Sequence, residues 1–265
     1  MKVKVVVLRT AGTNCDVETA FAFDQAGAEA DLVHLNRLLE DPGMLDQFQI
    51  LTIPGGFSYG DDISAGKIFA VQLMQDLGGR LADFVGKGKL VLGICNGFQV
   101  LVKAGLLPEV RASENYEQRV TLSDNDSGKF EDRWVWLKSF SDKCIFIEPD
   151  RMIYLPVAHA EGKFIPRDEA VLERIKSNDQ VVFRYVDEKG NSVGYPGNPN
   201  GSVDDIAGIC DPSGRILGLM PHPERHIQRT QHPHWTRLAE SRPGDGRAIF
   251  TRAVKFFTAM AIVLP

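Results

Sequence analysis

Cys95 stands in a sequence context that can make a thiol nucleophilic. It is the middle residue of the segment GICNG, residues 93–97, which follows an apolar run at 89–92 and precedes a helical pattern that stops at Gly105. A strand, a tight turn flanked by glycines and a helix form a nucleophile elbow, which lifts the central side chain to the edge of the sheet. The N-terminus of the helix also favours the thiolate. The alternative is a small buried structural cysteine.

His222 and Glu224 can supply a base and the acid that orients it. They belong to the segment PHPE, residues 221–224, in which each proline holds the preceding residue extended, so both side chains face the same way. A carboxylate beside an imidazole fixes its tautomer and stabilises its charged form. Alone, this segment is typical of a surface turn. With a cysteine elbow in the same chain, it favours catalysis.

Gly55 and Gly56 follow the predicted strand 48–53 and precede the loop 57–62. Ligands of open α/β sheets bind at the carboxyl ends of the strands. Two glycines there leave backbone N–H groups bare, which suits an anion or an oxyanion. The alternative is an ordinary Pro-Gly turn.

The other histidines and cysteines give weaker signals. His159 ends a predicted strand and could line a site, whereas Cys15 follows the first strand and favours packing or loop support. None of the histidines and cysteines has metal-ligand spacing, so no metal site is predicted. Structural or solvent-exposed roles are expected for the remaining ones: His34, Cys144, Cys210, His226, His232 and His234.

The elements that must position these residues alternate in type along the first half of the chain. Strands are predicted at 4–8, 30–35, 48–53 and 89–92, and helices at 16–27, 66–77 and 80–85. This alternation predicts an α/β fold with right-handed crossovers, a mostly parallel central sheet and flanking helices. The second half adds mixed β-structure and a last helix: strands at 134–137, 152–157 and 181–185, a hairpin over 206–219, and a helix at 247–261.

Composition excludes several classes of protein. The 265 residues are 43% hydrophobic, which is ordinary for a globular protein. A net charge of -5 argues against a nucleic-acid surface, and no apolar run approaches the roughly 20 residues that a membrane helix needs. The four cysteines are scattered, with no framework for disulfides, so we expect a cytoplasmic protein.

Together these segments resemble the class I, or triad, glutamine amidotransferases, in which Cys, His and Glu follow one another in this chain order. The resemblance covers residues 5–225 and narrows to the glutaminase subunits of phosphoribosylformylglycinamidine synthase, an enzyme of de novo purine synthesis. Five segments carry it: GGFSYGD at 55–61, GICNGFQ at 93–99, HAEG at 159–162, NPNGS at 198–202 and MPHPER at 220–225.

The resemblance implies a role for each residue of the site. The Cys95 thiolate attacks the carboxamide carbon of glutamine, His222 protonates the departing ammonia and then activates water, and Glu224 orients His222. The backbone N–H groups of Gly56 and Asn96 hold the oxyanion. Four further residues are implied in binding the substrate: Gly55, Phe57, Gln99 and His159.

The resemblance also implies partners. Ammonia would pass to a separate synthetase subunit, which uses ATP and magnesium and works with a small accessory subunit. This chain has no P-loop and no metal-ligand cluster, so we expect L-glutamine as its ligand and no cofactor or metal. Neither a nucleic acid nor a membrane is expected as a partner.

Two departures from the family pattern stand out. Ala160 replaces the first glycine of the usual His-Gly-Glu-Gly segment, which is a small change. Residues 226–246 look like an insertion before the last helix. This segment could either contact a partner or form the edge of a lid. We expect a single glutamine amidotransferase domain over 1–265, with this insertion.

Three other interpretations are open. A different hydrolase with a cysteine elbow is disfavoured, because in α/β-hydrolases the acid precedes the histidine, whereas Glu224 follows His222. A non-catalytic scaffold that only binds the synthetase is disfavoured by the intact Cys95, His222 and Glu224. A glutaminase subunit of another amidotransferase pathway is disfavoured by the segments FSY at 57–59 and NPN at 198–200.

Overall fold

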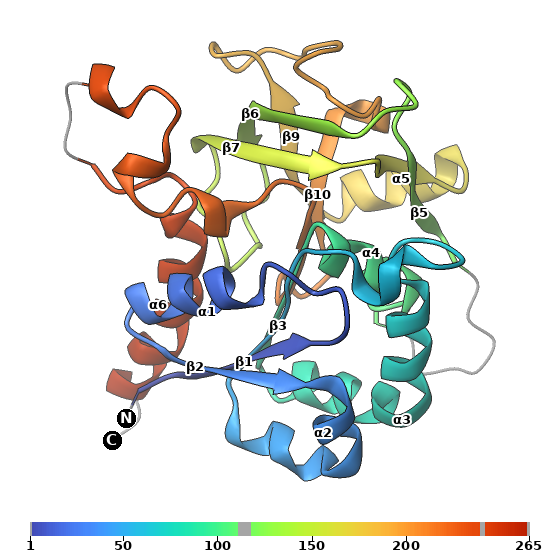
Figure 1. Ribbon diagram of the computed structural model, residues 1–265, viewed down its shortest axis with the longest axis vertical. Helices are drawn as coiled ribbons and strands as arrows, with labels where there is room; N and C mark the ends of the chain where they lie inside the picture. Colours follow the sequence, from blue (N-terminus) through green and yellow to red (C-terminus); the bar gives the residue numbers. More distant parts are fainter. Residues whose placement is uncertain (1, 111–117, 239–241, 264–265) are drawn as a thin grey trace.

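The computed structural model describes residues 2–110, 118–238 and 242–263, and most of its strands form one large sheet (Figure 1). Within these residues the sheet has nine strands in the order β2-β1-β3-β4-β11-β10-β9-β6-β7, and a two-stranded sheet pairs β5 with β8. The strands are β1 Lys4–Arg9, β2 Glu29–His34, β3 Ile50–Ile53, β4 Leu90–Ile94, β5 Val120–Asp124, β6 Glu131–Ser139, β7 Met152–His159, β8 Glu161–Pro166, β9 Val181–Val186, β10 Ile206–Cys210 and β11 Ile216–Leu219.

The predicted α/β fold is confirmed. Strands β2, β1, β3, β4 and β11 run parallel to one another, and β10, β9, β6 and β7 extend the sheet with antiparallel pairs. The central strands are almost continuously apolar because they are covered on both faces, and Val5, Val6, Val7 and Leu8 of β1 are completely buried. The hairpin of β10 and β11 was also predicted, and it links the antiparallel half to the parallel half.

Helices cover both faces of the parallel half. On one face α1 packs against α6, where the rings of Phe23 and Phe250 meet with centroids 4.9 Å apart, and α3 and α4 lie on the other side (Figure 1). None of the described helices combines the length and the apolar character that crossing a bilayer requires. The helices are α1 Asp16–Gln25, α2 Leu35–Glu40, α3 Lys67–Gly86, α4 Asn96–Lys103, α5 Glu169–Ser177 and α6 Arg247–Val263.

The two helices predicted at 66–77 and 80–85 are one helix, α3. We expected a break at Gly78 and Gly79, because glycine disfavours helix interiors by about 1 kcal/mol relative to alanine. The buried stripe of α3 instead continues past the glycines, from Leu73 and Leu77 to Leu81. Burial of that stripe on the sheet outweighs the local preference of two glycines.

The carboxyl ends of four parallel strands bring distant loops to one edge of the sheet. β1 leads to Cys15, β3 to Gly56, β4 to Cys95 and β11 to His222. Because adjacent parallel strands end at the same edge, their loops form one neighbourhood although they are far apart in sequence. The predicted site residues therefore lie at the carboxyl edge of the parallel strands, where α/β proteins bind ligands.

Candidate active site

Cys95 occupies the turn between β4 and α4, the position of a nucleophile elbow. Its backbone has φ 50° and ψ −106°, a combination that residues with side chains rarely adopt. The Cys95 amide donates to the Leu219 carbonyl oxygen at 2.8 Å, which ties this strained turn to β11. The thiol sulfur lies 3.8 Å from the Ala158 carbonyl oxygen, and the side chain is 5% exposed.

Gly93 and Gly97 are required by close packing rather than by a left-handed backbone. A Cβ at Gly97 would lie 1.8 Å from the Ile53 carbonyl oxygen, and a Cβ at Gly93 would lie 2.7 Å from the Gly97 carbonyl oxygen. The two glycines therefore let α4 start directly against β3. The positive φ of the turn falls on Cys95 itself.

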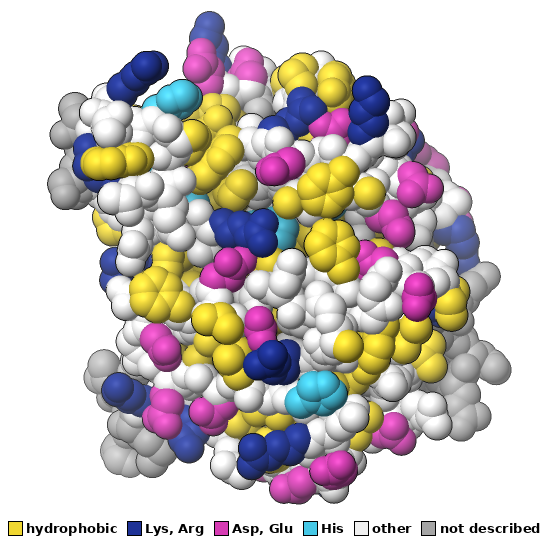
Figure 2. Space-filling view, in the orientation of Figure 1, with side chains coloured by type: hydrophobic (Ala, Val, Ile, Leu, Met, Phe, Trp, Pro, Cys, Tyr) yellow, Lys and Arg dark blue, Asp and Glu magenta, His cyan; other side chains and the backbone are white. Residues whose placement is uncertain are grey.

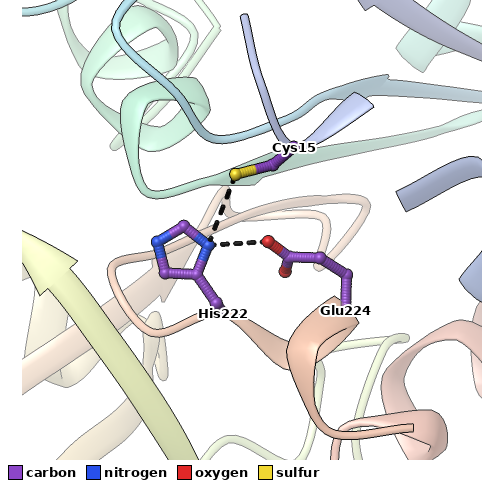
Figure 3. A group of neighbouring side chains, drawn as sticks. All are labelled: Cys15, His222 and Glu224. Carbon is purple, nitrogen blue, oxygen red and sulfur yellow. Dashed lines mark hydrogen bonds and ion pairs between the residues drawn. The ribbon is translucent and has the colours of Figure 1, made fainter. Parts of the chain in front are cut away.

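His222 and Glu224 form a buried pair in the loop after β11 (Figure 3). The two atoms His222 Nδ1 and Glu224 Oε1 are 2.6 Å apart, and since a carboxylate only accepts, Nδ1 carries the proton. The side chains are 2% and 0% exposed. His222 Nε2 is buried and has no hydrogen-bond partner within the described part of the chain, so its lone pair can accept a proton.

The electrostatics of His222 suit a base next to a thiol. Burial opposes the charged imidazolium, but the negative charges of Glu224 and of a Cys95 thiolate raise the pKa of His222 well above its ordinary value. His222 follows β11, the strand that pairs with β4 directly before Cys95. A thiol, an imidazole and an orienting carboxylate can together attack a carbonyl carbon and protonate the leaving group.

The loop after β3 is held by backbone hydrogen bonds to the loop after β1. The Cys15 amide donates to the Gly55 carbonyl oxygen at 3.3 Å, and the Phe57 amide donates to the Gly12 carbonyl oxygen at 2.9 Å. Since a trans peptide points its C=O and N–H in opposite directions, the Gly56 N–H points away from Cys15. A Cβ at Gly56 would come within 2.9 Å of the Gly12 carbonyl oxygen, so only glycine fits there.

Asn96 has a second bare N–H beside the thiol, because the first residue of a helix has no intrahelical acceptor. Its side chain accepts from Ser58 Oγ at 2.6 Å and donates to Asp61 Oδ1 at 3.1 Å and to Gln99 Oε1 at 2.9 Å. Gln99 Nε2 in turn donates to the Glu161 carbonyl oxygen at 2.6 Å. These bonds fix α4 to the loop after β3 and to β8.

A small cavity of about 40 Å³ opens beside Cys95. Of the predicted residues, Gly56, Phe57, Gln99 and His159 line this cavity. Gly55 does not line it and packs instead against the imidazole of His222, where a Cβ would lie 2.7 Å from Cε1. A much larger cavity, about 830 Å³ beside α6, contains none of the predicted site residues.

Two carboxylates that the sequence did not single out, Asp61 and Glu161, also line the cavity beside Cys95. Burial, and then the charge of Glu161, raise the pKa of Asp61 to about 6. Lys103 Nζ lies 3.9 Å from Glu161 Oε2 and balances part of this charge. Both carboxylates belong to segments that were noted for their glycines and histidine, but no spacing marked them as facing the thiol.

His159, at the end of β7, is a buried and neutral histidine. Its Nδ1 lies 3.1 Å from Asn125 Oδ1, whereas Nε2 is buried without a hydrogen-bond partner in the described residues. Burial and the charge of His222 lower the pKa of His159 to about 3. At neutral pH its Nε2 therefore offers a lone pair on the cavity wall.

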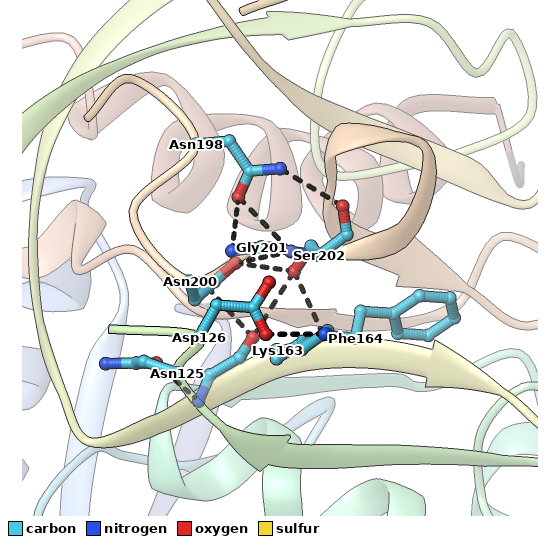
Figure 4. Close-up of polar contacts among 9 residues, drawn as sticks. Asn125, Asp126, Lys163, Phe164, Asn198, Asn200, Gly201 and Ser202 are labelled. Atoms are coloured by element: carbon cyan, nitrogen blue, oxygen red, sulfur yellow. Dashed lines mark hydrogen bonds and ion pairs between the residues drawn. The ribbon is translucent and has the colours of Figure 1, made fainter. Parts of the chain in front are cut away.

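The turn at 198–202 supports this wall through a buried polar network (Figure 4). Asn198 Oδ1 accepts the amide of Ser202 at 3.2 Å, and Ser202 Oγ accepts the amide of Phe164 at 2.9 Å. Asn200 Nδ2 donates to the Gly162 carbonyl oxygen at 2.9 Å. The predicted turn thus fixes the strand that follows His159.

Phe57 is an exposed aromatic side chain of the cavity wall, and a second exposed ring lies beside it. Phe57 lines the cavity while 44% exposed, and its ring lies 6.3 Å from that of Phe130, which is 50% exposed. On the face of the molecule drawn in Figure 2, hydrophobic side chains lie among charged ones.

One side chain lies elsewhere than expected. His226 was predicted to be solvent-exposed, but it is 4% exposed, and its Nδ1 lies 2.7 Å from the Tyr154 carbonyl oxygen, beneath the ring of Trp134. Cys15 was predicted to serve in packing or loop support; it is buried, and its sulfur also lies 4.0 Å from His222 Nδ1. Residues 239–241 of the predicted insertion lie outside the described residues.

Comparisons with known proteins show the family of the chain. Residues 2–257 match the model of the CobB/CobQ-like glutamine amidotransferase domain. A protein of Dehalococcoides mccartyi called phosphoribosylformylglycinamidine synthase subunit PurQ is 48% identical over 96% of this chain and 98% of its own length. The protein of that name from Archaeoglobus fulgidus is 46% identical over 96% and 97%. A chain in the structure of PurLQS from Thermotoga maritima is 31% identical, with a TM-score of 0.74 over 97% of this chain and 100% of that one.

Proposed function

The chain belongs to the CobB/CobQ-like glutamine amidotransferase family, among the PurQ subunits, and we propose that it is the glutaminase subunit of phosphoribosylformylglycinamidine synthase. It hydrolyses glutamine to glutamate and ammonia for de novo purine synthesis. The observation that carries this proposal is the pair of His222 and Glu224, 2.6 Å apart, in the loop after β11, the strand that pairs with the one leading to the strained Cys95.

The reaction has two halves, each with balanced proton transfers. The Cys95 thiolate attacks the carboxamide carbon, and the protonated His222 gives its Nε2 proton to the leaving ammonia, which leaves a thioester on Cys95. His222 then takes a proton from water, the hydroxide attacks the thioester, and glutamate departs as the Cys95 thiolate and imidazolium are restored. Glu224 keeps the Nδ1 proton in place throughout.

The oxyanion of each tetrahedral intermediate binds between the backbone N–H groups of Gly56 and Asn96. The Gly56 peptide has its N–H directed away from Cys15, and the Asn96 N–H is bare at the start of α4. One such donor is worth roughly 3 kcal/mol of transition-state stabilisation in comparable sites.

The cavity walls bind the amino-acid end of glutamine. The substrate ammonium lies near Asp61 and Glu161, the two carboxylates of the cavity. Phe57 and His159 complete the walls, Gln99 holds the Glu161 backbone in place, and Gly55 leaves room for the ring of His222.

Ammonia passes to the synthetase subunit, which uses ATP and magnesium and works with the small accessory subunit. The similarity to a chain of the PurLQS structure supports this assembly. The chain itself needs no cofactor or metal for glutamine hydrolysis, because the thiolate and the imidazole supply the nucleophile and the acid. No nucleic acid or membrane takes part.

We infer one amidotransferase domain over residues 1–265, with an insertion at about 226–246 before α6. The described part of that segment forms short turns at Arg229–Gln231 and Trp235–Arg237. We place the enzyme in the cytoplasm, which the four free cysteines support because reducing compartments keep thiols unpaired.

Reconstitution tests the function. The chain, mixed with the synthetase and the accessory subunit, should make phosphoribosylformylglycinamidine from glutamine, and the Cys95→Ala variant should do so only from added ammonia. A glutamine-mimicking electrophile should label Cys95 and no other thiol. A non-catalytic scaffold would not be labelled, and a glutaminase of another pathway would hydrolyse glutamine without supporting this product.

A further inference from the structure

A second set of potential ligands overlaps the triad on the Nδ1 side of His222 (Figure 3). One ligand atom each from Cys15, His222 and Glu224 lies within 4.8 Å of the other two, and all three side chains are buried. Cys15 comes from the loop before α1, 207 positions before His222, so no spacing in the sequence could reveal this group. The proposed reaction gives the Cys15 thiol no role.

The chemistry and size of this group suit a soft divalent cation. Thiolate sulfur, imidazole nitrogen and carboxylate oxygen are the ligands of zinc, whose bonds of roughly 2.0 to 2.3 Å place tetrahedral ligand atoms about 3.5 Å apart. The sulfur of Cys15 lies 4.0 Å from His222 Nδ1, and that nitrogen lies 2.6 Å from Glu224 Oε1. Side-chain shifts below about 1 Å would therefore produce a three-ligand site.

Glu224 provides an observation that is independent of the distances between the ligand atoms. Its second oxygen, Oε2, is fully buried and has no hydrogen-bond partner among the residues that the structure describes. A buried polar atom without a partner costs about 1 to 3 kcal/mol, and more when it is charged. A cation bound beside Glu224 would satisfy that oxygen.

Arg225 sets the strength of such binding. Its Nη2 lies 3.2 Å from Cys15 Sγ, and its Nε donates to Glu18 Oε1 at 2.8 Å. The guanidinium can donate to a metal-bound thiolate, but its charge also repels a cation. Burial raises the pKa of the Cys15 thiol, so metal binding must displace that proton. These terms favour weak, reversible binding over a structural metal site.

We propose that Cys15, His222 and Glu224 form an inhibitory site for a soft divalent cation of the zinc class. The cation replaces the protons on Cys15 Sγ and His222 Nδ1, and both are released to solvent unless one moves to Nε2. An imidazole with a metal on Nδ1 and its remaining proton on Nε2 can give that proton to ammonia only by becoming an imidazolate, and it has no lone pair to take a proton from water. The inhibition rests on the proposed glutaminase function, whereas the binding does not.

Cobalt(II) tests the binding without reference to activity. Titration of the purified chain should produce the near-ultraviolet absorption of a thiolate–cobalt bond, with one cobalt per chain. This band should persist in Cys95→Ala and in Cys144→Ala, a control at another buried thiol, and should be lost in Cys15→Ala and Cys15→Ser. Circular dichroism of the Cys15 variants verifies that they fold. A band that survives in folded Cys15→Ser, or that depends on Cys95, overturns the proposal.

Zinc(II) tests the inhibition in the complex with the synthetase. Zinc should inhibit glutamine-dependent turnover, and the concentration for half inhibition should rise at least tenfold in Cys15→Ser but not in Cys144→Ala. Equal inhibition of Cys15→Ser and the wild type would overturn the inhibitory role, because zinc would then act at Cys95. If no chain hydrolyses glutamine while the cobalt band appears, the proposed function fails and the metal site stands.

Discussion

Cys95 and Cys15 occupy similar positions in the fold and have different chemistry. Each lies at the N-terminus of a helix that follows a parallel strand, and each is buried. The backbone of Cys95 is strained at φ 50°, whereas Cys15 has φ −104°. Cys15 faces Nδ1, which Glu224 already occupies, while Nε2 has no hydrogen-bond partner among the residues that the structure describes. A helix N-terminus is therefore not enough to make a nucleophile, because the base must also have a free lone pair.

The charges around Cys15 reinforce this difference. Burial raises the pKa of the Cys15 thiol, and Glu224 adds to the shift, although His222 and Arg225 oppose it. Cys15 therefore stays protonated at neutral pH. A cysteine can share the neighbourhood of a catalytic base and remain inert.

Substitution of each cysteine by alanine should show the difference between Cys95 and Cys15 most clearly. Cys95→Ala should lower glutamine hydrolysis by about 10⁴-fold or more, because nothing else in the site can form the thioester. Cys15→Ala should stay within about tenfold of the wild type. Synthesis from added ammonia should survive in both variants, which shows that they fold and assemble. Glutamine-dependent turnover in Cys95→Ala would overturn the assignment of the nucleophile.

Loss of His222 should be more damaging than loss of Glu224. His222→Ala should be as damaging as Cys95→Ala, because residues that act as a unit are not additive. Glu224→Ala should be milder, with a loss of about 10²- to 10³-fold, because only orientation and charge support are removed. Steady-state rates of glutamate release measure both. An unchanged rate in Glu224→Ala would mean that another carboxylate orients His222.

Sequence reasoning succeeded where the chemistry was local. The elbow around Cys95 and the pair of His222 and Glu224 each lie within five residues, so spacing alone placed their side chains. The parallel sheet followed from alternating strands and helices. The break in α3 was wrong because Gly78 and Gly79 are local signals, whereas the stripe that carries the helix is tertiary.

The contacts that escaped prediction all join segments far apart in the chain. His226 is buried because Tyr154 and Trp134, on β7 and β6, cover it. Asp61 faces the cavity because Asn96, 35 positions later, holds its carboxylate. No periodicity or motif encodes such pairs, since they depend on how the strands are ordered in the sheet.

Asp61, which lines the cavity beside Cys95, should make KM for glutamine depend on pH. Because its pKa is about 6, its carboxylate becomes neutral below that pH and should attract the substrate ammonium less. KM for glutamine should therefore rise in the wild type as pH falls from 7 to 5. Asp61→Asn should raise KM by about tenfold at pH 7, a factor worth about 1.4 kcal/mol, and should lose this pH dependence. Asp62→Asn, at an exposed neighbour, is the matched control.

The same group makes a prediction about stability. A carboxyl whose pKa rises from 3.8 to about 6 on folding binds more protons in the folded state between these pH values. Its contribution to the free energy of unfolding therefore falls as pH rises through this window. Asp61→Asn should remove that fall in urea unfolding. A pH profile identical to that of the wild type would place the titration on another group.

The smallest expected effect concerns the loop after β3, which contacts Cys15 through Gly55 and lies beside Cys95 through Gly56. The Gly55 carbonyl accepts from the Cys15 amide, while Gly56 lines the cavity beside Cys95. Glycine peptides reorient easily, so we expect the isolated chain to populate a second loop state without the Gly56 donor.

Contact with the synthetase should shift this population towards the state with the donor in place. Because an oxyanion donor acts mainly in the transition state, the partner should raise kcat by about tenfold and lower KM by less. Glutamate release, measured with and without the partner, gives both constants. Equal kcat in the two conditions would mean that the site is already complete in the isolated chain. The hydrogen bond from the Cys15 amide to the Gly55 carbonyl would then be enough to fix the conformation of the loop.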